Sequence, residues 1–231
     1  MSIVDHLKSA LPKYKTKIPS SGKETFFRPF LVREEKILLL AQEDGDESTI
    51  VNAIATIVEN CVEDIDNAKK IPMYDLEYLF CQIRAKSVSE TAEPTFVCPK
   101  TEETVKIGIK LTDLQVEIGE REGDIKLNET VKIRLKDPVV TDYINMDKEN
   151  ATDSLISKCF DTITVGDEVF SGKDLTDVEK QEIIQNLTHK QYEEVYSFIA
   201  NQPKLYHVAK YRTKDGVERE LRLEGIGDFF G

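Results

Sequence analysis

The sequence has few basic residues for its size: 31 Lys and Arg stand against 43 Asp and Glu among 231 residues, a formal net charge of -12. Proteins that bind nucleic acid broadly need clustered Lys and Arg to neutralise phosphates, so this charge balance speaks against such a partner. It suits a protein that stays dispersed until it meets a particular partner. With 40% hydrophobic residues, the chain is long enough for a substantial core in one or two domains.

Long apolar runs are also missing. Residues 1–17 lack the uninterrupted apolar stretch of a secretory signal, and the most apolar short run, ILLLA at 37–41, is far too short to cross a bilayer. The four cysteines are widely scattered, which favours buried reduced thiols over a disulfide framework. We therefore expect a soluble intracellular protein without a membrane segment; its cysteines are Cys61, Cys81, Cys98 and Cys159.

A complete phosphate-binding loop is absent, although Gly22-Lys23 resembles part of one. Such a loop needs a second glycine five residues before Gly22, where this chain has Lys17. Glu24 replaces the hydroxyl residue that would hold magnesium, and a strand follows where a helix is required. The segment PSSG instead predicts a tight turn between strands at 14–18 and 24–30.

Metal-ligating and catalytic sets are incomplete as well. The segment FVCPKTEE looks like a zinc-knuckle hairpin, but Thr101 stands where the second thiolate would be, after Cys98. The other hairpin that could complete the site contains His207 and no cysteine. His6 and His189 lie far apart in the sequence, and G-x-S-x-G is missing. We expect no cofactor, no metal and no catalytic residues.

Hydrophobic periodicity predicts an α+β fold. Helical patterns occur at 31–43, at 50–61 and at 73–88, while a period of two begins near residue 93. A helix is expected over 154–163 with Asp153 as its N-cap, and two capping boxes, Thr176-x-x-Glu179 and Thr188-x-x-Gln191, open two more.

A terminal hairpin completes a fold of helical layers with peripheral β-hairpins. Between them we expect a small central β subdomain, a zinc-ribbon-like hairpin without its metal. The expected parts are an N-terminal hairpin plus helical region at 1–90, the β subdomain at 91–138, and C-terminal helices plus the last hairpin at 139–231.

The most distinctive residues are aromatic. Phe26, Phe27 and Phe30 surround Arg28 and run directly into a helix, and aromatic residues and Arg are enriched at binding hot spots. The same phenylalanines could simply fill the core beneath the helices. The adjacent aromatics of the terminal GDFFG are expected to be docked on the protein or on a partner, because a free tail rarely carries them.

Four segments together resemble the T-even-type bacteriophage baseplate hub protein family, from about residue 11 to the C-terminus. They are LPKYKTKIPSSGKETFFRPFLVREEKILLLAQE, DLEYLFCQIRAKSVSE, FVCPKTEE and LEGIGDFF. The first two are the most specific. Similar proteins often have a fuller Cys pattern in the knuckle, so Thr101 is a departure that weakens any expectation of metal.

The resemblance implies a non-enzymatic late protein of contractile-tail phages that helps to build the baseplate hub. It would act in the host cytoplasm during assembly, with the virion tail baseplate as an alternative location, on other hub proteins, the spike or the tape-measure protein. A transient assembly chaperone, a degenerate zinc-ribbon nucleic-acid module and an enzyme whose site forms by folding remain alternatives. The candidate partner-binding residues are Arg28, Phe30, Arg33, Arg84, Lys86, Phe229 and Phe230.

Overall fold

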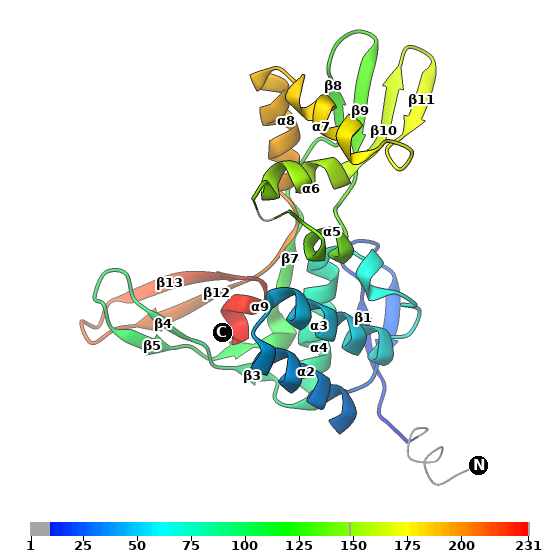
Figure 1. Ribbon diagram of the computed structural model, residues 1–231. Coiled ribbons are helices and arrows are strands. Elements are labelled where there is room, and N and C mark those ends of the chain that lie inside the picture. The colour runs from blue at the N-terminus through cyan, green and yellow to red at the C-terminus, as the bar shows by residue number, and fades with distance from the viewer. Residues whose placement is uncertain (1–9, 148, 231) are drawn as a thin grey trace. The chain divides into compact units, whose positions relative to one another are not determined.

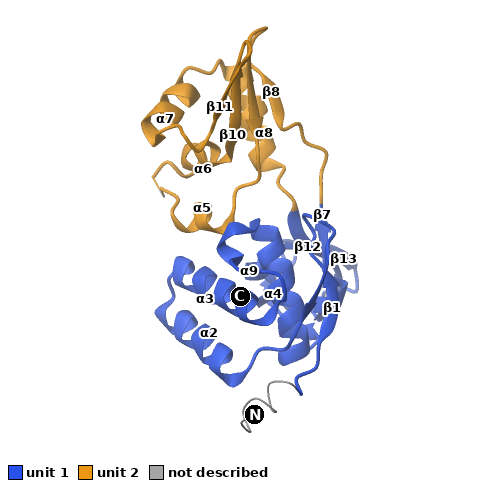
Figure 2. Ribbon diagram, turned by 90° about the vertical axis from the view of Figure 1, so that its right-hand side faces the viewer, with its two compact units in different colours: residues 1–117, 204–231 blue, residues 118–203 orange. Residues whose placement is uncertain are grey.

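A computed structural model describes residues 10–147 and 149–230 of the chain (Figure 1). The fold is α+β, as predicted, with helices and several small antiparallel sheets. It divides into two compact units: residues 1–117 with 204–231, called unit 1, and residues 118–203, called unit 2 (Figure 2). The chain leaves and re-enters unit 1 at paired positions, because Glu117 lies opposite Lys204 in the β7–β12 ladder.

Unit 1 begins with the predicted hairpin. Strands β1 (Tyr14–Lys17) and β2 (Glu24–Phe27) pair antiparallel, with Tyr14 opposite Phe27. The turn between them is closed by the amide of Gly22, which donates to the carbonyl of Ile18 at 2.8 Å. Gly22 has a φ of +66°, a left-handed conformation that glycine adopts without strain. The Gly22-Lys23 pair thus lies in a hairpin turn, and Lys23 forms an ion pair with Asp64 at 3.2 Å.

The three predicted helices follow as α2 (Val32–Asp44), α3 (Glu47–Cys61) and α4 (Met73–Ser87), with a short 3-10 turn at Ala68–Lys70. Gly45 ends α2 in the left-handed region, and the carboxylate of Asp46 caps α3 by accepting from the amide of Thr49. The apolar stripes of α3 and α4 are buried, as expected from their spacing: Ile54, Ile57, Val58, Cys61, Leu76, Leu79, Phe80 and Ile83.

Short strands complete unit 1. They are β3 (Thr91–Ala92) with β6 (Ile109–Lys110), and β4 (Thr95–Val97) with β5 (Thr104–Lys106), the expected second hairpin. After a 3-10 turn at Leu111–Asp113, β7 (Gln115–Glu117) joins β12 (Lys204–Arg212) and β13 (Glu218–Glu224) in the order β13-β12-β7. The chain closes with helix α9 (Gly225–Phe230), which places the terminal aromatics.

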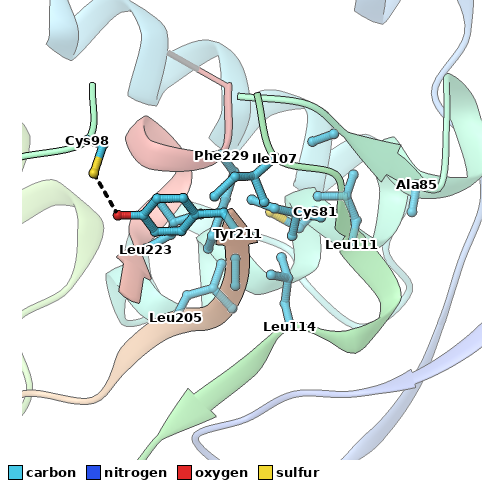
Figure 3. Close-up of a cluster of buried hydrophobic side chains, with 13 residues drawn as sticks. Cys81, Ala85, Cys98, Ile107, Leu111, Leu114, Leu205, Tyr211, Leu223 and Phe229 are labelled. Atoms are coloured by element: carbon cyan, nitrogen blue, oxygen red, sulfur yellow. Dashed lines mark hydrogen bonds between the residues drawn. The ribbon is translucent and has the colours of Figure 1, made fainter. Parts of the chain in front are cut away.

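The core of unit 1 gathers residues that are far apart in the sequence. Cys81 of α4, Ile109 of β6, Leu205 of β12, Leu223 of β13 and Phe229 of α9 belong to one buried cluster. Figure 3 shows part of it around Tyr211, whose hydroxyl points to the sulfur of Cys98. Burial of such side chains is the main source of stability for a fold built from short strands.

Unit 2 has its own sheet, in the order β11-β10-β9-β8. Its elements are β8 (Asp124–Lys126), β9 (Val131–Leu135), α5 (Val140–Ile144), α6 (Ala151–Cys159), β10 (Phe160–Val165), β11 (Glu168–Ser171), α7 (Asp177–Gln185) and α8 (His189–Ala200). A separate buried cluster includes Ile133, Ile156, Phe160 and Val195. Both predicted capping boxes are present, with Thr176 and Thr188 at the N-caps of α7 and α8.

The structure corrects the helix expected over 154–163. Helix α6 ends at Cys159, and the segment from Phe160 forms a strand that pairs with β9, where Ile163 lies opposite Ile133. The N-cap is Asn150, so Asp153 lies in the first turn and accepts a hydrogen bond from the hydroxyl of Tyr192 at 2.8 Å. Tertiary pairing with β9 overrides the helical pattern of this apolar run.

The unit boundaries also fall elsewhere than the part boundaries expected after residues 90 and 138. Within 91–138, strands β3 to β7 belong to unit 1, whereas β8 and β9 belong to unit 2. The physical reason is that β7 pairs with β12, while β9 pairs with β10. Strands that lie close together in the sequence therefore contribute to two different cores.

Candidate functional site

Three of the candidate residues from distant segments meet where α9 packs on α4. The guanidinium carbon of Arg84 lies 4.2 Å from the ring centroid of Phe230. The ring of Phe80 meets that of Phe230 edge to face, with centroids 6.2 Å apart. Phe229 is 1% exposed and belongs to the core, while Phe230 is half-buried. The expectation that the terminal aromatics are docked is confirmed, and they dock on the protein itself.

Helix α9 is held in this position by Glu77 of α4. The carboxylate of Glu77 accepts a hydrogen bond from the amide of Ile226 at 3.3 Å. Gly225 has a φ of +69°, and a Cβ there would lie 3.0 Å from Oε1 of Glu77, so a side chain would disturb the approach. Burial raises the pKa of Glu77 to about 7, against the opposing effect of the Ile226 hydrogen bond.

A pocket of about 420 Å³ opens beside Arg84, entirely within unit 1. Its walls come from α2, α3, α4, α9 and the segment around Pro94, and the apolar side chains that line it include Leu38, Ile50, Ile54, Phe80 and Phe230. The volume falls in the range of small-molecule and side-chain binding pockets. A mostly apolar cavity with one cation in its wall can hold a group that is itself both apolar and anionic.

Arg84 lines this pocket, but one nitrogen of its guanidinium group is closed off from it. Its Nη1 atom is buried and has no hydrogen-bond partner among the residues that the structure describes. Burial lowers the pKa of Arg84, with Cys81 acting weakly in the other direction, although an arginine remains a cation throughout the physiological range. Buried polar atoms normally have partners, so an unpaired guanidinium nitrogen calls for an explanation.

Arg28, Phe30 and Arg33 lie at the start of α2, around the carboxylate of Glu34. Oε1 of Glu34 accepts from Nη2 of Arg28 at 3.1 Å and from Nε of Arg33 at 2.7 Å, and Oε2 accepts from the amide of Leu31 at 2.6 Å. Burial opposes ionisation of Glu34, but these donors lower its pKa overall.

The same junction is tied to the neighbouring helices. Arg28 donates to the carbonyl of Asn60 at 2.9 Å, and the amide of Phe30 donates to the hydroxyl of Ser87, also at 2.9 Å. These contacts join the hairpin to the C-terminal ends of α3 and α4. Arg28 therefore has structural partners within the chain, and its predicted role in partner binding stays a prediction.

Lys86, the remaining candidate, lies near the end of α4. Its ammonium group pairs with Glu90 and lies 5.3 Å from the ring centroid of Tyr14 in β1. The Glu90 hydrogen bond raises the pKa of Lys86. This lysine connects the helix to the first hairpin and does not line the pocket around Arg84.

Helix α2 carries a surface that residue-type reasoning did not select. It buries Glu34 and Ala41, whereas Val32 is 66% exposed, Leu39 52% and Leu40 66%. A signal for this was present in the run ILLL at 37–40. Successive helical residues point about 100° apart, so four consecutive apolar residues cannot all face one core. We call Val32, Leu39 and Leu40 the α2 apolar face.

Comparison with known proteins gives one family. A model described as "T4 bacteriophage base plate protein" matches residues 11–231. The chain belongs to this family. No match was found among curated proteins or among solved structures. The resemblance seen in the sequence is thereby confirmed, and membership implies contact with other phage structural proteins and a place in the virion tail.

The hairpin that resembles a zinc knuckle, β4 and β5 with the turn between them, contacts the rest of unit 1 through side chains. Cys98 lies at the end of β4 and is fully buried, and the hydroxyl of Tyr211 donates to its sulfur at 3.4 Å (Figure 3). Thr101 occupies the position of a second thiolate, and its side-chain hydrogen bond is the largest of the influences that lower the pKa of the Cys98 thiol. Within residues 10–147 and 149–230, no group of three His, Cys, Asp or Glu side chains is arranged to hold a metal ion.

The histidines are distributed over separate elements. His207 lies in β12 opposite Leu223, and His189 is the first residue of α8, whereas His6 lies outside the described residues.

Baseplate structural families are generally non-enzymatic. Among the described helices, none combines the length and the apolar character needed to cross a bilayer.

Proposed function

We propose that the protein is a non-enzymatic component or assembly factor of the baseplate hub of a contractile-tail phage. It acts by protein–protein recognition, made late in infection and working in the host cytoplasm before the tail is complete. Its partners are other hub subunits, the spike or the tape-measure protein. Family membership supports a baseplate role, and the finer assignment to the hub rests on the sequence segments that carry the resemblance.

The observation that carries this proposal is the α2 apolar face. A helix of 13 residues that buries Glu34 and Ala41 while exposing Val32, Leu39 and Leu40 gains little from packing on its own unit. Exposed large apolar side chains that recur on one helix favour a binding role over packing within the unit. Leu38 and Gln42 of the same helix line the pocket around Arg84, so face and pocket adjoin.

The candidate residues have different roles in this proposal. Arg84 and Phe230 line the pocket and would meet a partner directly, while Phe229 supports them from the core. Arg28 and Arg33 fix the start of α2 through Glu34, and Phe30 and Lys86 connect that region to α4 and to the first hairpin. Their proposed contribution is to hold the α2 apolar face in position.

Charge substitutions on α2 test the proposal. A phage lacking this gene is complemented with Leu39→Glu, Leu40→Glu or the wild-type protein, and hub formation is scored by electron microscopy and by infectious titre. We expect both variants to fold normally and to lower the titre by at least about tenfold, since a charge in an apolar interface costs more than 1.4 kcal/mol. Val169→Glu, at a 65% exposed position in unit 2, is the matched control.

Normal assembly with folded Leu39→Glu and Leu40→Glu proteins contradicts the proposal. Mass spectrometry of purified particles then separates a hub subunit from a transient chaperone. A subunit remains in the particle in stoichiometric amounts, whereas a chaperone is found with partners in infected cells and is missing from the finished virion.

A further inference from the structure

The pocket around Arg84 also specifies the chemistry of what binds there. Nη1 of Arg84 is buried and unpartnered within the described residues, while the guanidinium plane is held over the Phe230 ring at 4.2 Å. Stacking fixes the orientation of the group without satisfying its N–H donors. Nη1 itself is enclosed by the protein, but Arg84 lines the pocket and forms no ion pair within the described residues, so an anion in the pocket would gain a charge-assisted hydrogen bond to the guanidinium.

The chain contains a completed example of the same arrangement. In unit 2 the guanidinium of Arg121 lies 4.3 Å from the ring centroid of Phe198, and its Nη2 pairs with the carboxylate of Asp137. Each arginine therefore stacks on a phenylalanine ring of its own unit. Arg121 also pairs with a carboxylate, whereas Arg84 does not within the described residues. A carboxylate is the acceptor that matches the planar fork of a guanidinium.

The walls of the pocket narrow the choice of anion. The apolar surface of the pocket comes from Leu38, Ile50, Ile54 and Phe80. A phosphate or a nucleic-acid backbone would lose its hydration there without gaining hydrogen bonds from these side chains, which is unfavourable. Phosphate-rich ligands also need several cations, whereas Arg84 is the one cation among the described residues that line the pocket, and the Lys106 that pairs with the lining carboxylate of Glu93 is not among them. A carboxylate beside a large apolar side chain fits both the cation and the walls.

We propose that the pocket binds an Asp or Glu side chain of a partner protein, in a segment where a large apolar residue directly precedes or follows it. The carboxylate pairs with the guanidinium of Arg84, the apolar neighbour fills the space between α3 and α9, and the segment continues over the α2 apolar face. The inference rests on the proposed function, since it assumes that a protein partner lies on α2.

Matched peptides test this with the full-length protein. The probes are acetyl-Phe-Asp-Leu-amide, its Asn counterpart, and acetyl-Phe-Leu with a free terminal carboxylate, titrated while the methyl NMR signals of Leu38 and Ile54 are followed. We expect the Asp peptide to shift these signals with at least about tenfold higher affinity than the Asn peptide, the effect of one charge-assisted hydrogen bond. Arg84→Met should remove the difference, and Arg84→Lys should retain part of it.

Arg84→Met keeps the aliphatic stem and removes the unpaired cation, so it is expected to fold. Leu38→Trp, which narrows the pocket from the α2 side, provides a second variant and should weaken binding of the Asp peptide by a similar factor.

Equal affinities for the Asp and Asn peptides, or no shifts at all with the wild-type protein, overturn the inference. Preference for the free terminal carboxylate contradicts the proposed side-chain source. Concentration-dependent shifts without peptide identify a second copy as the occupant and contradict it too. Because these titrations need no phage, their failure is distinguishable from failure of the complementation experiment with Leu39→Glu.

Discussion

Helices α2 and α8 have similar lengths and opposite relations to their cores. In α8, Val195, Phe198 and Ile199 are buried, and a Thr188–Gln191 capping box begins the helix. In α2, the leucines at 39 and 40 face outward and the buried positions include the charged Glu34. Packing therefore explains the apolar residues of α8 but leaves those of α2 unexplained within the chain. The difference supports the proposal that the α2 apolar face meets a partner, although unit 2 also exposes apolar residues such as Val169 and Val178.

The two stacked arginines show the same contrast at the level of one side chain. Arg121 in unit 2 has both a ring and a carboxylate, whereas Nη1 of Arg84 in unit 1 has no hydrogen-bond partner within the described residues. A self-contained unit satisfies its buried charges internally. An unsatisfied one is consistent with a site that is completed on assembly.

The largest effects on stability are expected when the two phenylalanine rings that stack on Arg121 and Arg84 are truncated to alanine. Phe198→Ala removes a core side chain of unit 2 and should lower the free energy of unfolding by about 3–5 kcal/mol. Phe230→Ala removes a half-buried ring and should cost about 1–2 kcal/mol. Urea unfolding, followed by amide signals of each unit, measures both values, and equal losses would show that the pocket ring is as much a part of the core as Phe198.

Glu77 gives unit 1 a pH dependence. Because burial raises its pKa from 4.5 to about 7, the folded protein retains a proton that the unfolded chain releases between these values. Stability should therefore fall as pH rises from 4.5 to 7, by about 3 kcal/mol at most. Glu77→Gln should abolish this slope in unit 1, and an unchanged slope in the variant would rule Glu77 out as its source.

Replacing each stacked arginine by methionine tests whether Arg121 and Arg84 contribute differently to the stability of their units. Arg121→Met leaves the carboxylate of Asp137 without its cation and should destabilise unit 2 by about 2 kcal/mol. Arg84→Met removes a cation that has an unpaired nitrogen and should change the stability of unit 1 by less than about 1 kcal/mol. Thermal unfolding of both variants measures the difference, and similar losses would indicate a structural role for Arg84.

The smallest effect is expected on the α2 apolar face. Leu40→Gln places an amide at a 66% exposed position and should change the free energy of unfolding by less than about 0.5 kcal/mol. A loss above about 2 kcal/mol in urea unfolding would mean that the leucine contributes to packing, and that α2 differs less from α8 than its exposure suggests.

Local signals made most of the elements predictable. The hairpin at Gly22 and the capping boxes at Thr176 and Thr188 depend on residues close in sequence, and each was predicted correctly. The strand from Phe160 was missed because the local pattern at 154–163 is helical, although β11 follows directly and pairs with it in a hairpin; its other partner, β9, lies some 25 residues earlier. The unit boundaries depend on similar long-range pairings, such as that of β7 with β12.

The candidate site was predictable in its residue types more than in its arrangement. Arg84, Phe229 and Phe230 were selected as an arginine and two aromatics, and the packing of α9 on α4 brings them together. The sequence alone could not show that Arg28 and Arg33 share Glu34, or that Nη1 of Arg84 has no hydrogen-bond partner in the described chain, since both depend on side-chain geometry. The exposure of Leu40 could have been inferred from the unbroken run ILLL.

The most direct test of partner recognition through unit 1 is affinity purification from infected cells with three tagged proteins: wild type, Arg84→Met and Val169→Glu. We predict that identified baseplate proteins are recovered equally with wild type and Val169→Glu, and at least about tenfold less with folded Arg84→Met, which loses one charge-assisted hydrogen bond. Equal recovery with all three proteins would contradict the account.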